Sequence, residues 1–390
     1  MDGILRGGLT LRSAALAIAA LVAIIALSAV FIIFRPFDRL SETAPPVEAL
    51  SVERVQLDND GITLQLRAGG SEGMRIAQVQ VDGAYWQFHL QPDGPIGYLA
   101  QAALHIPYPW IAGETHHITI VSASGATFDH TIDVALPTTT SGNGNMAMLI
   151  AVGLMVGFVP IILGYGFSPL LSGGSKRRDF ALALTVGLLL FLLIDTLQES
   201  MEAADQAAAG LHAPVLVWLV AILSFLILLA TGRWQGSAPE GTRLALFIAI
   251  GIGLHNLGEG LAIGASFASG EVALASFLIL GFALHNVSEG IAIAAPVKAR
   301  ALGPLLALAA LAGLPAVPGT LLGAIAYAPL WVALAFAIGA GAIMQVIVEV
   351  SAYLRRGAQT RKDAFQPMAS LAGLASGMML MYLTGLLVRG

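Results

Sequence analysis

Two short segments of this chain repeat one pattern of polar residues inside apolar surroundings. The first, at residues 255–260, reads His-Asn-Leu-Gly-Glu-Gly, and the second, at residues 285–290, reads His-Asn-Val-Ser-Glu-Gly. Each copy lies in an apolar run long enough to cross a bilayer, where one ionisable side chain costs roughly 2.5–3.5 kcal/mol to insert. Polar residues at such a depth need a functional or structural reason.

The spacing within each copy indicates what that reason is. On a helix, residues i and i+4 share a face, so each histidine forms an imidazole–carboxylate pair with the glutamate that follows it, and each asparagine adds an amide oxygen beside the pair. Imidazole and carboxylate groups are ligands for zinc and its first-row neighbours. The alternative is that the pairs are hydrogen-bonded contacts that fix helix packing. The candidate ligands are His255, Asn256, Glu259, His285, Asn286 and Glu289.

Two further i, i+4 pairs lie in other apolar runs. Asp195 and Glu199 come near the end of one run, and an acidic loop without basic residues follows them. An acidic mouth of this kind attracts divalent cations, although a solvated helix end would have the same composition. Gln345 and Glu349 lie toward the other end of a later run, before Arg355 and Arg356, so Glu349 either receives a cation or pairs with one of these arginines. We predict that both pairs lie on a transport pathway.

The composition indicates a polytopic membrane protein with a soluble portion. The chain has 390 residues, of which 57% are hydrophobic and 11% charged, and its mean hydropathy is +0.81, whereas soluble domains carry about 25% charged residues. A net charge of −5 argues against a basic nucleic-acid binder. The chain has no cysteine, which excludes disulfides and thiolate metal sites.

The order of the segments predicts four regions. Residues 1–40 are predicted to be a cytoplasmic tail and an anchor helix at Ala14–Phe34, for which a cleaved signal peptide is the alternative. Residues 41–137 alternate polar and apolar positions between Gly and Asp turns, which predicts a small all-β sandwich outside the cytoplasm. Residues 138–145 are predicted to be a linker, and residues 146–390 a core of eight membrane helices.

The eight predicted core spans give a consistent topology. Most of the 19 basic residues fall in segments that this count places in the cytoplasm, together with the N-terminus. The β-domain and the C-terminus then lie outside. The predicted core spans are Met146–Leu170, Phe180–Met201, Ala213–Leu229, Leu244–Ala268, Val272–Ala294, Ala301–Tyr327, Leu330–Leu354 and Met368–Leu387. In the sixth of these, Pro315 and Pro318 predict a broken or kinked helix.

Five of the eight histidines lie in the predicted β-domain, at positions 89, 105, 116, 117 and 130. We expect them to be solvated positions on a polar face, with a metal-capture surface as the alternative. Adjacent strand residues point to opposite faces, so His116 and His117 are not expected to serve one site.

The two copies of the His-Asn-x-x-Glu-Gly pattern resemble helices four and five of the ZIP (Zrt/Irt-like protein) family of divalent metal transporters. The resemblance is strongest to the bacterial GufA-like branch, and it covers about Met146 to the C-terminus. It implies a fold in which two central helices lie between two three-helix bundles related by inverted symmetry. It also implies metal movement toward the cytoplasm, across the inner membrane if the source is bacterial.

Carried over by position, the resemblance implies two adjacent metal positions. The first falls on both His–Glu pairs, and the second on both asparagines and both glutamates. In the family, a fifth ligand of the second position comes from a glutamate of helix six, where this chain has Ala316. This departure predicts that a full two-metal centre lacks one ligand.

The sequence thus predicts a transporter of a divalent metal, zinc, with iron, manganese and cadmium as ions that the same ligands accept. Its partners are metal ions and the lipid bilayer, a homodimer is compatible with the sequence, and no nucleic acid or cofactor is expected. The chain is not expected to be an enzyme, because it has no His-Glu-x-x-His pattern and no nucleophile next to a base. The alternatives are a membrane-embedded metalloenzyme and a metal-sensing receptor that use the same buried residues.

Overall fold

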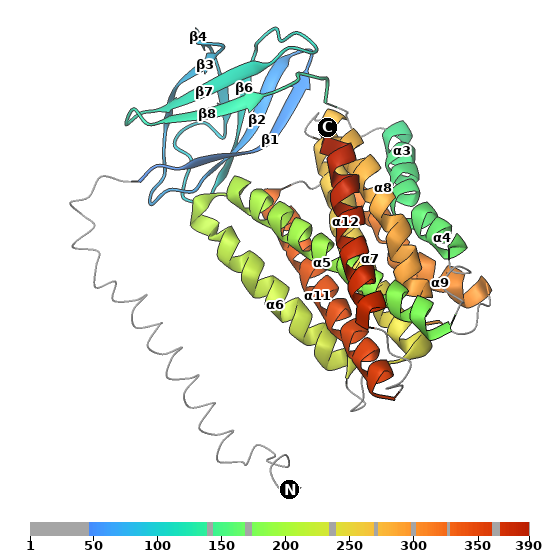
Figure 1. Ribbon diagram of the computed structural model, residues 1–390. Coiled ribbons are helices and arrows are strands. Elements are labelled where there is room, and N and C mark those ends of the chain that lie inside the picture. The colour runs from blue at the N-terminus through green and yellow to red at the C-terminus, as the bar shows by residue number, and fades with distance from the viewer. Residues whose placement is uncertain are drawn as a thin grey trace, which may run out of the picture. The chain divides into compact units, whose positions relative to one another are not determined.

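The computed structural model describes residues 47–138, 143–167, 174–233, 239–268, 272–297, 302–325, 328–360 and 367–389. Within these ranges, eight strands come first along the chain and helices follow (Figure 1). The strands are β1 Leu50–Asp58, β2 Gly61–Ala68, β3 Ile76–Val81, β4 Ala84–Trp86, β5 His89–Gln91, β6 Gln101–Ile106, β7 His116–Ser122 and β8 Thr127–Ile132. The helices are α3 Asn143–Gly153, η1 Leu154–Phe158, α4 Val159–Gly166, α5 Gly174–Gln206, η3 Ala209–Leu211, α6 Ala213–Gly232, α7 Gly241–Ala268, α8 Val272–Ala294, α9 Leu302–Gly313, α10 Ala316–Ile325, α11 Pro329–Thr360 and α12 Pro367–Arg389.

Seven helical segments among the described residues are long and apolar enough to cross a membrane. They correspond to the first seven predicted core spans. The length and composition of these helices indicate an integral membrane protein. The eighth predicted span falls on α12, whose apolar stretch, Pro367–Leu383, is shorter. The predicted anchor at Ala14–Phe34 lies outside the described residues. The nine-span count and the sidedness therefore stay predictions.

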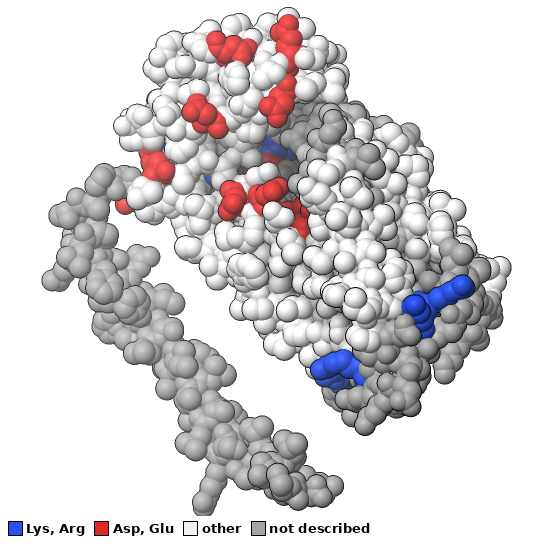
Figure 2. Space-filling model, in the orientation of Figure 1, with Lys and Arg blue, Asp and Glu red and all other residues white. Residues whose placement is uncertain are grey.

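Charged side chains are distributed unevenly on the helical part. On the face shown in Figure 2, acidic side chains gather at one end of the helices and basic side chains at the other, with an uncharged band between them. Exposed Asp205 belongs to the acidic end of α5, and exposed Lys176 and Arg177 belong to its opposite end. This distribution is typical of a protein whose middle zone faces lipid.

The strands form two antiparallel sheets of four, with the orders β1-β2-β6-β5 and β4-β3-β7-β8. Alternate residues of each strand point inward, so that Leu64 and Leu104 of one sheet and Ile118 and Ile120 of the other are fully buried in one apolar core. A two-residue turn at Asp82-Gly83 joins β3 to β4, and both residues have positive φ, as such hairpins require. The predicted small β-sandwich is thus present in this segment.

One of the five predicted surface histidines is buried. His116 is 2% exposed, whereas His117 beside it is exposed, in line with the expected opposite orientation of neighbouring strand residues. The prediction of a solvated position was wrong for His116 because a partner turns it inward: its Nδ1 donates to Asp82 at 2.9 Å. The alternation of strand residues fixes which face a residue takes, but not which face carries a polar partner.

The Asp82 carboxylate makes the stability of this sheet dependent on pH. Burial raises the pKa of Asp82, but hydrogen bonds from the His117 backbone, His116 and Tyr108 lower it by more, so the pKa lies below its ordinary 3.8. The unfolded chain then binds more protons than the folded one, and the stabilisation is present above about pH 4 and is lost as the pH falls through the folded pKa.

We therefore expect hydrogen exchange of β3 and β7 in the full chain to accelerate below about pH 4 beyond its intrinsic change. The Asp82→Asn variant should lack this extra acceleration. Because the carboxylate is partly exposed, the effect should be no more than about 1 kcal/mol. Identical pH profiles of the native chain and the variant would contradict the prediction.

Two helices in the apolar part are interrupted. The sixth predicted span breaks between α9, which ends at Gly313, and α10, which begins at Ala316, as Pro315 led us to expect. The first predicted span contains a π-helical turn, η1, which ends two residues before Pro160, a residue with no N–H to continue the hydrogen-bond ladder. Both interruptions lie where side chains of the duplicated pattern make contact.

Glycines allow several helices to approach backbone to backbone. Gly260 and Gly264 of α7 pack against Gly319 and Gly323 of α10, and a Cβ atom added at Gly264 would lie 2.1 Å from the carbonyl oxygen of Thr320. Such small-xxx-small pairs are a common way for membrane helices to associate. They hold α7 firmly against α10.

The same packing connects other pairs of helices. Gly164 of α4 meets Gly290 of α8, and Gly373 and Gly377 of α12 lie against the backbone of α5. These close backbone approaches therefore join three pairs of helices: α4 with α8, α7 with α10, and α5 with α12.

Candidate metal site

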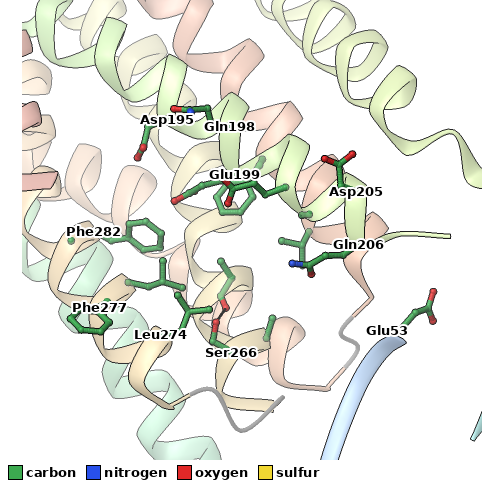
Figure 3. A pocket seen from close by; sticks show the side chains of 18 of the residues that line it. Glu53, Asp195, Gln198, Glu199, Asp205, Gln206, Ser266, Leu274, Phe277 and Phe282 are labelled. Carbon is green, nitrogen blue, oxygen red and sulfur yellow. Dashed lines mark hydrogen bonds between the residues drawn. The ribbon is translucent and has the colours of Figure 1, made fainter. Parts of the chain in front are cut away.

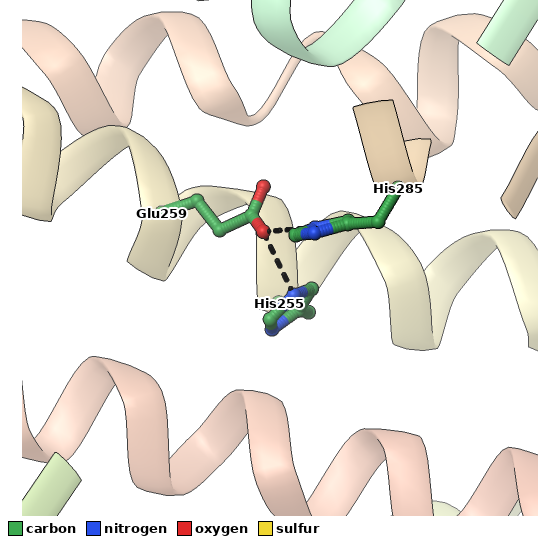
Figure 4. A group of neighbouring side chains, drawn as sticks. All are labelled: His255, Glu259 and His285. Atoms are coloured by element: carbon green, nitrogen blue, oxygen red, sulfur yellow. Dashed lines mark hydrogen bonds and ion pairs between the residues drawn. The ribbon is translucent and has the colours of Figure 1, made fainter. Parts of the chain in front are cut away.

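Helices α7 and α8 bring three of the predicted ligands to one point. His285 Nε2 lies 2.5 Å from Glu259 Oε1, and His255 Nε2 lies 3.0 Å from the same oxygen (Figure 4). One ligand atom from each residue lies within 4.8 Å of the others. This grouping is compatible with a single ion that has imidazole and carboxylate ligands.

All three residues are buried. Glu259 is 0% exposed, His255 2% and His285 6%. His255 Nε2 lies at ion-pair distance from Glu259 Oε1 and has no hydrogen-bond partner among the described residues. Its other nitrogen, Nδ1, is 3.5 Å from the Thr196 hydroxyl on α5. His255 therefore keeps an unused nitrogen directed at the same oxygen that His285 contacts.

The two asparagines take equivalent places on the two helices. Asn256 Nδ2 donates to the Ala312 carbonyl at 3.0 Å and to Glu289 Oε2 at 3.5 Å. Asn286 Nδ2 donates to the Val156 carbonyl at 3.0 Å and to Glu259 Oε2 at 3.3 Å. Each amide thus links a helix interruption, in α9 or η1, to the carboxylate of the other copy.

These contacts fix the direction of both amide oxygens. A carbonyl oxygen only accepts, so the NH₂ group must face it and the Oδ1 atom must point the other way. Both Oδ1 atoms are buried and have no hydrogen-bond partner among the described residues, and the same holds for Glu289 Oε1. Three buried acceptors without a donor, around carboxylates that are 0% and 3% exposed, favour the presence of a cation.

A cavity of about 1110 Å³ reaches His285, and acidic residues of α5 line part of it. Figure 3 shows Asp195 and Glu199 on the α5 side, with Phe277 and Phe282 of α8 on another side. The two predicted pathway residues of α5 therefore share one cavity with a candidate ligand.

The other two predicted pathway residues, Gln345 and Glu349, are both 0% exposed on α11. Glu349 Oε1 accepts a hydrogen bond from Arg233 Nε at 2.8 Å. The sequence had suggested Arg355 or Arg356 as the partner; instead, the end of α6 brings Arg233 alongside.

No protein-family model matches this chain. No curated protein matches it either.

Ala316, which takes the place of the expected fifth ligand, is buried at the start of α10. Its carbonyl oxygen lies against Gly260 of α7, only 2.3 Å from where a Cβ of that residue would be. Its methyl group offers no ligand atom for an ion.

Sequence reasoning missed three groups that support the site. These are the carbonyl of Val156, the hydroxyl of Thr196 and the guanidinium of Arg233. Pro160 could have pointed to the first, because a proline inside a span frees backbone carbonyls of the preceding turn. No sequence signal indicated the other two.

Proposed function

We propose that this protein transports a divalent metal ion, zinc, across the membrane toward the cytoplasm. The observation that carries the proposal is the buried cluster of His255, Glu259 and His285 on two adjacent membrane-spanning helices. Their ligand types suit zinc, and iron, manganese and cadmium accept the same atoms. The position of the cluster on two helices long enough to span a membrane favours passage of the ion over turnover of a substrate.

The direction of the amide oxygens supports a second, weaker position beside the first. Among the described residues, Asn256 Oδ1 and Asn286 Oδ1 are buried acceptors without a hydrogen-bond partner, and the NH₂ groups of the same amides contact the carboxylates of Glu289 and Glu259. The missing ligand at Ala316 leaves this position with fewer donors. We therefore propose that the ion binds tightly at the position formed by the histidines and glutamates. The adjacent position formed by the two amide oxygens would hold an ion only transiently.

The positions of the other polar residues support a route through the protein. Asp195 and Glu199 line the cavity that reaches His285, and they would collect cations on one side. Gln345 and Glu349 lie on α11, which contacts His255 through Gly339, and they would receive an ion leaving on the other side. Movement of the α4–α8 and α7–α10 pairs against α5 and α12 would then expose the ion alternately.

The arrangement around the two asparagines supports the proposed ZIP-like core of eight helices with an inverted repeat. Asn256 bonds a carbonyl at the break between α9 and α10, and Asn286 bonds a carbonyl at η1 between α3 and α4. In the same way, Gly260 meets α10 and Gly290 meets α4. Each copy of the pattern thus faces an interrupted helix.

The test is zinc flux into proteoliposomes, comparing the native chain with the Glu259→Ala, Glu289→Ala double variant. We expect flux in the native chain and a loss of essentially all of it in the double variant. Glu240→Ala, which changes a carboxylate that is 63% exposed, is the control and should transport normally. Flux that survives the double change would mean that the cluster is structural; an absence of flux with zinc, iron, manganese and cadmium would leave the metalloenzyme and receptor alternatives.

A further inference from the structure

A second group of buried polar atoms lies on α11, away from the cluster described above. Gln345 and Glu349 are one helical turn apart, and both are 0% exposed. Neither Gln345 Oε1 nor Gln345 Nε2 has a hydrogen-bond partner among the described residues, and Glu349 Oε2 has none there either. Buried amide and carboxylate atoms without a hydrogen-bond partner are rare, because each costs free energy to desolvate.

The only described partner of this group is a basic residue at the end of another helix. Arg233, the C-terminal cap of α6, donates from Nε to Glu349 Oε1 at 2.8 Å, while 42% of its side chain stays exposed. The neighbouring carbonyl of Gly232 accepts a hydrogen bond from Arg243 Nη2 at 3.0 Å, and Gly232 also lies beside Gln345 Nε2. The end of α6 is therefore fixed over Gln345 and Glu349.

Gln345 and Glu349 lie along the seam between α7 and α11, which also includes the candidate ligand His255. On α11, Gly339 packs against His255, and farther along Ala342 and Val346 pack against Gly251 of α7. At a rise of 1.5 Å per residue, Gln345 and Glu349 lie roughly 9–15 Å beyond the level of His255. An ion that leaves the His/Glu cluster along this seam would meet them next.

We propose that Gln345 and Glu349 form a second site for a divalent cation and that the guanidinium of Arg233 occupies it as a built-in competitor. Its place on a metal route rests on the transport function proposed above, whereas its ability to bind a cation does not. The ligands would be the two carboxylate oxygens of Glu349 and the amide oxygen of Gln345. Oxygen donors of this kind suit manganese and also bind zinc.

Arg233 can compete with a cation because both would compensate the negative charge of the buried Glu349 carboxylate. A positive partner stabilises the ionised form of a carboxylate as buried as Glu349, and an arginine is always charged. Because Arg233 uses one oxygen and remains half exposed on a long side chain, it can turn toward water when a cation arrives. Glu349 would then keep a positive partner throughout the exchange, and the ion would be held only weakly.

The test measures binding at equilibrium, in a chain whose central cluster has been disabled by Glu259→Gln and Glu289→Gln. The full chain is purified in detergent and titrated with Mn²⁺, whose free concentration is read by its paramagnetic resonance signal, and then with Zn²⁺. Adding Arg233→Gln should raise the affinity for one equivalent of cation by at least about tenfold. Adding Glu349→Gln to that variant should abolish the gain.

Two controls separate the competitor from a general loss of positive charge. Arg356→Gln removes a charge at the same end of α11, where the ion-pair partner is the 63% exposed Glu240, and it should give no gain. Arg233→Lys keeps a weaker competitor and should give an intermediate gain. It also serves as the second variant if Arg233→Gln folds poorly.

An unchanged cation affinity in both Arg233 variants would overturn the proposal, as would a gain that persists after Glu349→Gln. A gain that appears equally with Arg356→Gln would also overturn it. Because the central cluster is disabled and no flux is measured, these outcomes do not depend on whether the protein transports zinc.

Discussion

We expect the Glu259→Gln chain to bind zinc at least about 100-fold more weakly than the native chain, beyond the effect of losing a supporting hydrogen bond to a ligand. Glu259 contacts both histidines, and it also accepts a hydrogen bond from Asn286. The glutamine keeps the size of the side chain but removes its charge. Titration of the purified full chain with zinc measures the change.

Comparison with Glu289→Gln makes the test specific to this geometry. Glu289 occupies the same place in the second copy, but its described hydrogen bond is a 3.5 Å contact from Asn256. Its replacement should therefore weaken zinc binding less than that of Glu259. Equal losses, or a larger loss at Glu289, would mean that the ion is not centred on the three-residue cluster.

The second large effect is expected from Gly264→Ala on α7. The new Cβ would lie 2.1 Å from the carbonyl oxygen of Thr320 and 2.9 Å from the backbone nitrogen of Ala324. These are backbone atoms of α10, so the two helices must separate to accommodate a single methyl group. We expect a loss of about 1–3 kcal/mol or more in the free energy of unfolding. Thermal unfolding in detergent, together with the yield of monodisperse protein, measures it.

Gly303→Ala is the matched control for this prediction. A Cβ at Gly303, near the start of α9, would meet no atom within 4 Å. Since alanine is favoured over glycine in a helix by about 1 kcal/mol, this change should be neutral or stabilising. If Gly264→Ala behaves like the control, the close approach of α7 and α10 is not present in the protein.

The duplicated pattern shows how much of the site could be predicted from the sequence. The i, i+4 spacing correctly placed each histidine on the same face as the following glutamate, and the depth of both copies in apolar runs pointed to burial. All six predicted ligands are in fact buried and linked by contacts between the copies. Yet the closest contact, His285 with Glu259, is between the two copies and not within one.

The fold was predictable to a similar extent. Apolar runs of sufficient length identified the seven long helices, Pro315 identified the break in the sixth span, and alternation identified the strands. These features depend on residues close together in the sequence, whose preferences do not need a partner. The π-helical turn at η1 was missed, because a single Pro160 is also compatible with a simple kink.

By itself, the sequence determined which residues are buried in helices and which side chains share a face, because helical and strand periods follow from the local backbone. Only the tertiary structure decided the partners: Val156 for Asn286, Arg233 for Glu349 and Asp82 for His116. The first two pairs are separated by more than a hundred positions along the chain. Their contact depends on how helices pack through glycines and small residues, and that packing is a property of surfaces that no single segment contains.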